Sequence, residues 1–367
     1  MARIDNILQL VKSADATDLH LASGSPPIIR KLGDLEPTSH KALSARQVEA
    51  LLYEIITDEQ IRTFEKSGDL DVAYGTEDIG RYRINMFRRE GGIGAAIRMI
   101  ADSLMTLEEL SIPEAVIDII SQKSGLILVT GPTNSGKTTT LSAIVDYINR
   151  HFCKHIVTLE DPIEYVHENI NCLVTQRQIG AHTASFGQGL RAALREDPDV
   201  ILVGEMRDTE TISLALTASE VGLLVLGTLH TNSAAQTVDR IVDVFPSDQQ
   251  PQARVMLADS LLAALSQQLL KRKNGLGRVM ACEVMTRTTA LSSLIRDGKT
   301  HQIPGMIQTN RKLGMRLLDD RLREMVDTEE VDISEAIRVA NDPSKFMDVL
   351  GKTSREKSGR IPILNSR

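Results

Sequence analysis

A loop of small polar residues and one lysine separates an apolar run from a helical pattern in "GLILVTGPTNSGKTTTLSAI", residues 125–144. Residues 131–138 match the pattern G-x-x-x-x-G-K-[ST] in full. Gly131 and Gly136 permit backbone conformations that a side chain would block, so the N–H groups of the loop can point inward as an anion nest. The positive end of the following helix strengthens this nest. The stretch therefore predicts a phosphate-binding loop between a buried strand and a helix.

The polar groups of the loop have distinct expected roles. Lys137 is expected to reach the β- and γ-phosphates of a nucleoside triphosphate, and the Thr138 hydroxyl is expected to ligate Mg²⁺. ATP and Mg²⁺ are therefore the predicted cofactors. The predicted nucleotide-binding residues are Gly131, Pro132, Thr133, Asn134, Ser135, Gly136, Lys137, Thr138 and Thr139.

An acidic side chain closely follows the aliphatic run of residues 200–203 in "DPDVILVGEMRD". Hydrolysis of a bound triphosphate needs a carboxylate that ligates Mg²⁺ or orients water. Gly204 occupies the position of the usual Walker B aspartate, which leaves Glu205 as the predicted water-activating carboxylate. We expect residues 200–203 to form a strand beside the one that precedes the phosphate-binding loop. A solvated strand end without a catalytic role is the alternative.

A second acidic cluster ends another aliphatic run, in "IVTLEDPIE". Glu160 is predicted at the carboxyl end of a strand, where open α/β sheets bind ligands. It is therefore a candidate catalytic residue and a candidate second ligand of Mg²⁺. In the alternative interpretation the cluster only caps a helix, with Asp161 as the cap and Pro162 in the first turn.

A histidine follows a further aliphatic run in "LGTLHTNSAAQTVDRI". Its expected place at the carboxyl edge of the sheet favours a phosphate-sensing role for His230 over the structural role of most lone histidines. Ser233 and Gln236 have the spacing of a capping box and predict the start of the next helix. Arg240 lies on that helix and is either a second catalytic group near the phosphate or an ion-pair partner.

The pattern of apolar residues predicts an α/β fold. From residue 113, short aliphatic runs alternate with helical patterns, as in parallel strands covered by helices on both faces. Before that point, residues 81–86 alternate between apolar and polar or cationic side chains, which predicts a strand with one cationic face. Residues 44–66 are expected to form a helix that starts at a Ser44 cap. The predicted organisation is a small α/β domain at 1–105, a linker at 106–112, an ATPase core at 113–285, C-terminal helices at 286–350 and a flexible tail at 351–367.

The composition excludes several classes of protein. The net charge is −7 and aromatic residues are only 3% of the chain, which argues against a surface built to hold nucleic acid. The three cysteines are far apart, without a C-x-x-C pair, so we expect buried free thiols and neither a disulfide framework nor a zinc site. No apolar run approaches the ~18 residues that a membrane span needs. We therefore expect a cytoplasmic protein whose membrane contact is peripheral.

Four stretches taken together resemble the motifs of the type II/type IV secretion ATPases. They are "GPTNSGKTTT", "TLEDPIE", "ILVGEMRD" and "GTLHTNSAAQTVDRIVDVFP", which look like the Walker A motif, Asp box, atypical Walker B motif and His box of that family. Within the family, the chain is most similar to the type IV pilus retraction motors of twitching motility, over about residues 15–350. The resemblance implies a RecA-like ATPase domain, a PAS-like N-terminal domain and a homohexameric ring at the cytoplasmic face of the inner membrane.

The resemblance also implies partners and further site residues. The expected partners are other copies of the chain, a platform protein of the pilus in the inner membrane and a paralogous retraction motor, with no nucleic acid. In this family, arginines of the N-terminal domain reach the nucleotide across a domain or subunit junction. Arg81, Arg83 and Arg98 are the matching candidates, and a hydrated charged face is the alternative.

One stretch departs from the pattern of retraction motors. These motors usually carry an "AIRNLIRE"-like signature, whereas residues 290–299 read "ALSSLIRDGK". An accessory retraction motor is therefore a possible identity. A pilus assembly or type II secretion ATPase of the same superfamily remains the alternative, although the chain is short and lacks the four-cysteine zinc element often found there. A nucleic-acid motor and a nucleotide-gated scaffold that does not hydrolyse ATP are the alternatives from other classes.

Overall fold

The structure, a computed structural model, describes residues 2–14, 16–31, 33–76, 78–100 and 104–347. The chain divides into two compact units, residues 1–104 and 105–367. The expected flexible tail at 351–367 lies outside the described residues, as do residues 348–350 of the expected C-terminal helices.

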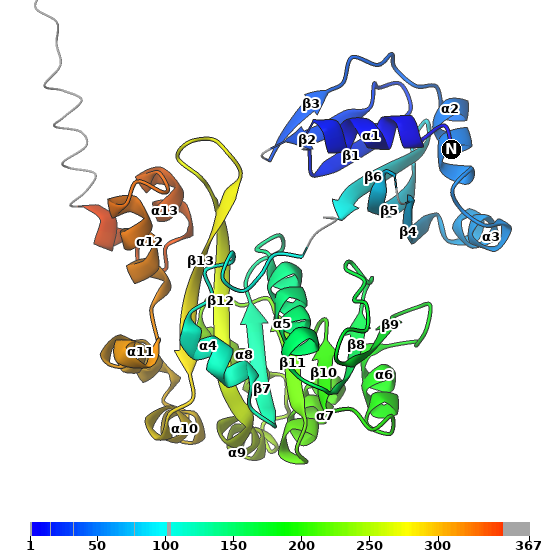
Figure 1. Cartoon of the computed structure of the whole chain (residues 1–367). Coiled ribbons are helices and arrows are strands. Elements are labelled where there is room, and N and C mark those ends of the chain that lie inside the picture. The colour runs from blue at the N-terminus through cyan, green and yellow to red at the C-terminus, as the bar shows by residue number, and fades with distance from the viewer. Residues whose placement is uncertain (1, 15, 32, 77, 101–103, 348–367) are drawn as a thin grey trace, which may run out of the picture. The chain divides into compact units, whose positions relative to one another are not determined.

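In its described residues, the first unit forms a six-stranded antiparallel sheet with helices packed on one face (Figure 1). The strand order is β3-β2-β1-β6-β5-β4. The elements are α1 (Asp5–Ser13), β1 (Asp18–Ala22), β2 (Ile28–Lys31), β3 (Asp34–Pro37), α2 (Ala45–Tyr53), α3 (Asp58–Ser67), β4 (Asp69–Thr76), β5 (Gly80–Arg89) and β6 (Gly92–Ile100). All three helices contribute to one apolar core with the inner face of the sheet.

The opposite face of this first sheet is cationic. Side chains along β5 alternate between buried apolar residues and partly exposed polar ones, as the sequence predicts. Arg81 and Arg83 lie on the outer face, and Arg98 of the neighbouring strand pairs in register with Arg83. The Nε atom of Arg98 lies 2.8 Å from the Asp18 carboxylate, and that of Arg83 lies 3.7 Å from Asp71. Arg83 and Arg98 therefore have acidic neighbours on their own sheet.

The described residues of the second unit form a seven-stranded sheet in the order β13-β12-β7-β11-β10-β8-β9. All neighbours pair parallel except β12 and β13, which are antiparallel. The elements are α4 (Glu114–Ile120), β7 (Gly125–Thr130), α5 (Lys137–His151), β8 (His155–Glu160), β9 (Leu173–Gln178), α6 (Phe186–Ala193), β10 (Val200–Val203), α7 (Thr209–Glu220), β11 (Leu224–Leu229), α8 (Ala234–Asp243), α9 (Gln250–Ser260), β12 (Leu261–Lys271), β13 (Arg278–Thr286), α10 (Thr289–Arg296), η1 (Thr300–Gln302), α11 (Ile303–Thr309), η2 (Arg311–Leu313), α12 (Leu318–Asp327), α13 (Ile333–Val339) and η3 (Pro343–Phe346).

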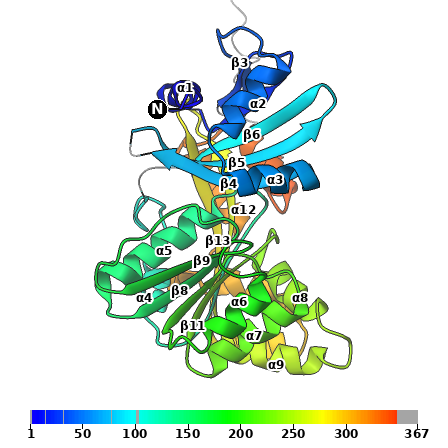
Figure 2. The same ribbon diagram turned by 90° about the vertical axis from the view of Figure 1, so that its right-hand side faces the viewer.

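Helices cover both faces of the second sheet, with α4 and α5 on one side and α6, α7, α8 and α9 on the other (Figure 2). Alternate side chains of β7 point to opposite faces. Leu126 and Leu128 join the core with α6 to α9, whereas Ile127 and Val129 join the core with α4 and α5. The carboxyl ends of the parallel strands meet at one edge of the sheet, which is where open α/β sheets bind ligands.

The last helices of the described chain, α12, α13 and η3, form a core of their own. Apolar side chains of α12, α13 and η3 pack against the far ends of β12 and β13, where the two strands are joined by their hairpin turn. Leu322, Met325 and Phe346 are fully buried in this group. This small core is therefore attached to β12 and β13 at one edge of the second sheet.

Several expectations from the sequence are wrong. The strand of residues 200–203, β10, lies between β11 and β8 and not beside β7. Residues 161–164 form a loop, so Asp161 does not cap a helix. Residues 44–66 form two helices, because Thr57 caps a second one with its own capping box, although the predicted Ser44 cap is present. Cys153 is exposed, whereas Cys172 and Cys282 are buried as expected and all three are free thiols.

Candidate active site at the carboxyl edge of the second sheet

The loop between β7 and α5 has the backbone that its sequence requires. Gly131 and Gly136 adopt φ angles of 145° and 89°, and Asn134 adopts 67°. These values lie in the region that favours glycine and tolerates asparagine. The Nζ atom of Lys137 donates to the carbonyl oxygens of Gly131 at 2.8 Å and Pro132 at 2.9 Å. The lysine thus folds back over its own loop and keeps its charge at the mouth of the nest.

A residue that the sequence did not single out braces this loop. The side-chain amide of Gln267, on the neighbouring strand β12, donates to the Ser135 carbonyl at 2.8 Å. A Cβ atom at Gly131 would lie 2.4 Å from the main-chain carbonyl oxygen of Gln267, so only glycine fits there. The Ser135 hydroxyl is buried and has no hydrogen-bond partner. A buried donor of this kind fits the oxygen of a bound phosphate.

A cleft beside the loop brings together three of the predicted site residues. Thr138 at the start of α5, Glu160 at the end of β8 and Glu205 just after β10 all line it. The complete lining is Thr138, Leu141, Ser142, Glu160, Asp161, Pro162, Glu164, Phe186, Leu202, Gly204, Glu205 and Thr228. The acidic side chains therefore converge on the N-terminus of α5 from two different strands.

Glu205 is held by a histidine and an arginine. The Nε2 atom of His230 lies 2.8 Å from the Glu205 carboxylate, and Arg207 pairs with the same oxygen. The Glu205 side chain is 19% exposed, so it faces the cleft while remaining in reach of water. Burial lowers the pKa of Lys137, and the negative charge of Glu205 opposes that shift. Glu205, His230 and the loop lysine therefore belong to one electrostatic cluster.

Glu160 is almost fully buried and is positioned by its neighbours. Thr158 donates its hydroxyl to the Glu160 carboxylate at 2.6 Å, and the Gln176 amide donates to it at 3.0 Å. Gln176, on the adjacent strand β9, also donates to the Tyr165 carbonyl at 2.8 Å and accepts from the His167 N–H at 2.8 Å. This glutamine fixes both the carboxylate and the loop that follows it. A lone glutamine on a half-exposed strand carries no sequence signal for such a role.

Comparison with known proteins identifies the family. Residues 81–342 match the family described as "Type II/IV secretion system protein". The chain belongs to this family. It is 46% identical over 343 residues to the type IV pilus retraction ATPase PilT of Pseudomonas aeruginosa, covering 94% of this chain and 99% of that protein. It is 34% identical to the type IV pilus ATPase PilU of the same organism, over 95% and 92% of the two chains.

A solved structure supports the fold of this secretion-family chain. The crystal structure of the pilus retraction motor PilT with bound ADP superposes with a TM-score of 0.83 at 40% identity, covering 92% of this chain and 98% of that one. The expected α/β fold, an N-terminal domain followed by an ATPase core, is therefore confirmed, and so is the resemblance predicted from the four motifs.

The remaining predicted site residues lie apart from this cleft or on the other unit. Arg240 is exposed on α8 and makes no ion pair with another residue that the structure describes. Arg81, Arg83 and Arg98 lie on the cationic face of the first unit. The altered signature at residues 290–299 covers α10, whose Leu291 and Ile295 are buried. No helix among the described residues is both long enough and apolar enough to cross a bilayer.

The residues in the cleft fit a magnesium ion. Mg²⁺ prefers hard oxygen ligands and is usually held by one or two protein groups together with phosphate oxygens. The Thr138 hydroxyl and the Glu160 carboxylate line the same cleft and are oxygen donors. Among the described residues, no group of three or more histidine, cysteine or acidic side chains is arranged around a metal position.

Proposed function

We propose that this chain hydrolyses ATP and uses the energy to retract type IV pili. The proposal rests on a relative named as a retraction ATPase, which is 46% identical to this chain over 94% of its length. The phosphate-binding loop beside Glu205, which is intact, supports it. The chain binds nucleotide as a member of this ATPase family. The 34% identity to PilU is lower, which supports a main retraction motor over an accessory one.

The phosphates of ATP sit in the loop of residues 131–139, with Lys137 turned from its carbonyl partners toward the β- and γ-phosphates. That movement exchanges two hydrogen bonds to neutral carbonyl oxygens for hydrogen bonds to anionic phosphate oxygens, in which both partners carry charge. Thr138 and Glu160 would hold Mg²⁺, which supplies positive charge to the phosphate oxygens. Gln176 keeps the Glu160 carboxylate in place.

Glu205 orients the attacking water as the general base. Its position at the strand end, within reach of the cleft, suits this role, and His230 and Arg207 hold the carboxylate in one orientation. His230 lies on the loop after β11 and senses the terminal phosphate through the same contact. Arg81, Arg83 and Arg98, and more weakly Arg240, are proposed to stabilise the charge that develops on the transferred phosphoryl group.

The working form is proposed to be a homohexameric ring at the cytoplasmic face of the inner membrane. The proposed partners are a platform protein of the pilus and, in hosts that have one, a paralogous retraction motor. The proposed domain limits are a PAS-like domain at 1–105 and a RecA-like core at 113–285, joined by a linker at 106–112. Loss of the γ-phosphate contact is proposed to rotate the N-terminal domain against the ATPase domain, as in other nucleotide switches.

Deletion of the gene in its host tests the direction of movement. Excess surface pili with loss of twitching supports retraction, whereas absence of pili would identify an assembly motor instead. Phosphate release by the purified full chain with ATP and Mg²⁺ tests hydrolysis itself. A chain that binds ATP but releases no phosphate would be a nucleotide-gated scaffold.

A further inference from the structure

A buried carboxylate lies outside the cleft, on a strand at the edge of the second sheet. Glu283, on β13, is 3% exposed and forms no ion pair with another described residue. Its two oxygens instead accept backbone N–H groups, from Ala234 at 2.7 Å and from Leu318 at 3.2 Å. Burial raises the pKa of Glu283, and these two hydrogen bonds oppose that shift.

The two N–H groups that Glu283 accepts come from the first residues of two different helices. Ala234 begins α8 and Leu318 begins α12. The first N–H groups of a helix have no partner within it and carry partial positive charge. Leu317, the residue before α12, provides no side-chain cap. Glu283 therefore caps α12 from a distance and at the same time holds the start of α8.

The start of α8 is directly linked to the histidine of the cleft. Only Thr231, Asn232 and Ser233 separate His230 from α8. The hydroxyl of Thr231 lies 2.7 Å from that of Thr237 on α8, which fixes this short loop to the helix. A shift of the first turn of α8 therefore moves His230 relative to Glu205.

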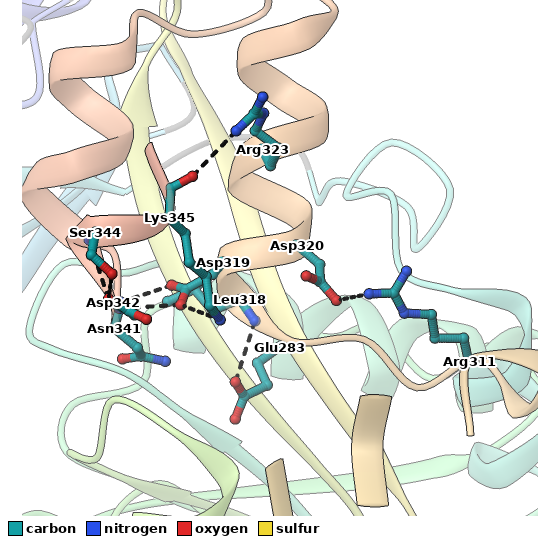
Figure 3. A network of polar contacts seen from close by, with 10 residues as sticks. All are labelled: Glu283, Arg311, Leu318, Asp319, Asp320, Arg323, Asn341, Asp342, Ser344 and Lys345. Carbon is teal, nitrogen blue, oxygen red and sulfur yellow. Dashed lines mark hydrogen bonds and ion pairs between the residues drawn. The ribbon is translucent and has the colours of Figure 1, made fainter. Parts of the chain in front are cut away.

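The start of α12 is linked in turn to the end of the described chain. Asp319, the next residue after Leu318, is 5% exposed and accepts the N–H groups of Asn341 at 2.8 Å and Asp342 at 3.1 Å (Figure 3). Lys345 donates to the same carboxylate at 3.2 Å. These contacts join the start of α12 to residues 341–345.

Resting on the proposed function, we propose that Glu283 is a positioning residue for hydrolysis, which fixes the start of α8, and through it His230, against the C-terminal helices. An apolar side chain in place of Glu283 would leave the N–H groups of Ala234 and Leu318 without this acceptor, at a cost of about 1–3 kcal/mol for each N–H group that stays buried. Glu283 therefore stabilises both helix starts, and because one side chain serves both, it also links them. The phosphate-binding loop does not touch Glu283, so nucleotide affinity should not depend on it.

The test compares Glu283→Met with Asp319→Asn in the full-length chain. Methionine keeps the volume and removes both acceptors, while Ser233 continues to cap α8 by accepting from the Gln236 N–H. Because small displacements of catalytic groups cost up to about 100-fold in rate, we expect kcat for ATP to fall about 10-fold to 100-fold. The affinity for ADP should stay within about twofold of the original, since the loop itself is unchanged.

Asp319 is the matched control because it is also a buried carboxylate that accepts two backbone N–H groups, but it has no contact with α8. Asp319→Asn should loosen residues 341–346 and leave kcat within about threefold. A folded Glu283→Met chain with unchanged kcat overturns the inference. An equal loss of kcat in both variants would also overturn it, because it would indicate general loosening of the C-terminal helices.

A measurement on the unaltered chain does not depend on how the variants fold. Hydrogen exchange is followed with ADP and with a non-hydrolysable ATP analogue. The inference predicts that the change of nucleotide alters protection at residues 230–236 and at 318–322 together. A response confined to 230–236 contradicts it. If the unaltered chain releases no phosphate from ATP, the proposed function fails, while the exchange experiment still decides whether the two helix starts respond together.

Discussion

The imidazole of His230 and the carboxylate of Glu205 lie 2.8 Å apart, at the ends of the neighbouring strands β11 and β10. Strand order alone creates this contact, because parallel neighbours end at the same edge of the sheet. A carboxylate held beside an imidazole, within reach of the phosphate-binding loop, has the geometry of a general base whose orientation depends on a second group.

Glu205→Gln should abolish turnover and spare binding. The amide keeps the size of the side chain but cannot accept the proton of the attacking water, so we expect kcat to fall by about 10²–10⁴. Steady-state phosphate release and nucleotide binding by calorimetry separate the two effects. Turnover at the original rate would remove Glu205 from the mechanism. Lys137→Ala serves as the comparison in which both binding and turnover are lost.

The two partners of Glu205 should differ in importance. The Arg207 side chain is 76% exposed, and exposed ion pairs contribute about 0–1 kcal/mol. Arg207→Ala should therefore change kcat less than about fivefold. His230→Ala should lower it at least about 10-fold, because it removes the group that orients the base. Comparable losses in the two variants would show that orientation of Glu205 does not depend mainly on His230.

Gln176→Leu should lower the affinity for Mg²⁺ and leave the affinity for ATP unchanged. Loss of a group that orients a metal ligand typically costs about 10-fold to 100-fold in metal affinity. The Mg²⁺ concentration at half-maximal activity should rise accordingly. Gln178→Leu is the control, since Gln178 lies on the same strand and its side chain accepts from the Ile163 N–H and not from a neighbour of Glu160. Equal shifts in the two variants would argue against a specific role for Gln176.

The cationic face of the first unit offers a sharp choice between two roles. An arginine that stabilises the transferred phosphoryl group contributes about 10³–10⁵ in rate. An exposed ion pair contributes about 0–1 kcal/mol. If the role of Arg98 is the structural one of its ion pair with Asp18, Arg98→Ala and Asp18→Ala should have the same small effect on kcat. A large loss with Arg98→Ala alone supports the catalytic role, and the same comparison applies to Arg83 and Asp71.

The three thiols should differ in reactivity. Burial raises the pKa of Cys282 to about 12 and also raises the pKa of Cys172. Because the thiolate is the reactive form, both should resist a thiol reagent at pH 8 until the chain unfolds. The exposed Cys153 should react at once. Cys153→Ser should remove the fast phase, and a second fast phase in the folded chain would contradict the burial of the other two.

The sequence predicts the elements of the cleft better than their arrangement. Each aliphatic run near a motif forms the expected strand, because a run buried on both faces has few alternatives. The order of the strands is set by tertiary packing, so the place of β10 could not be predicted. The strand β12 carries Leu, Ala and Gln, which favour helices, yet it is extended because it lies between β7 and β13. Glu283 and Gln267 were missed since they act on residues far away in the chain.

The contact between Gln267 and the carbonyl of Ser135 has a consequence for the catalytic cycle. The side chain of Gln267, on a neighbouring strand, holds the backbone of the phosphate-binding loop before any ligand arrives. Capture of a triphosphate then requires little ordering of the chain, which favours tight association. We therefore expect the product to leave without unfolding of this loop.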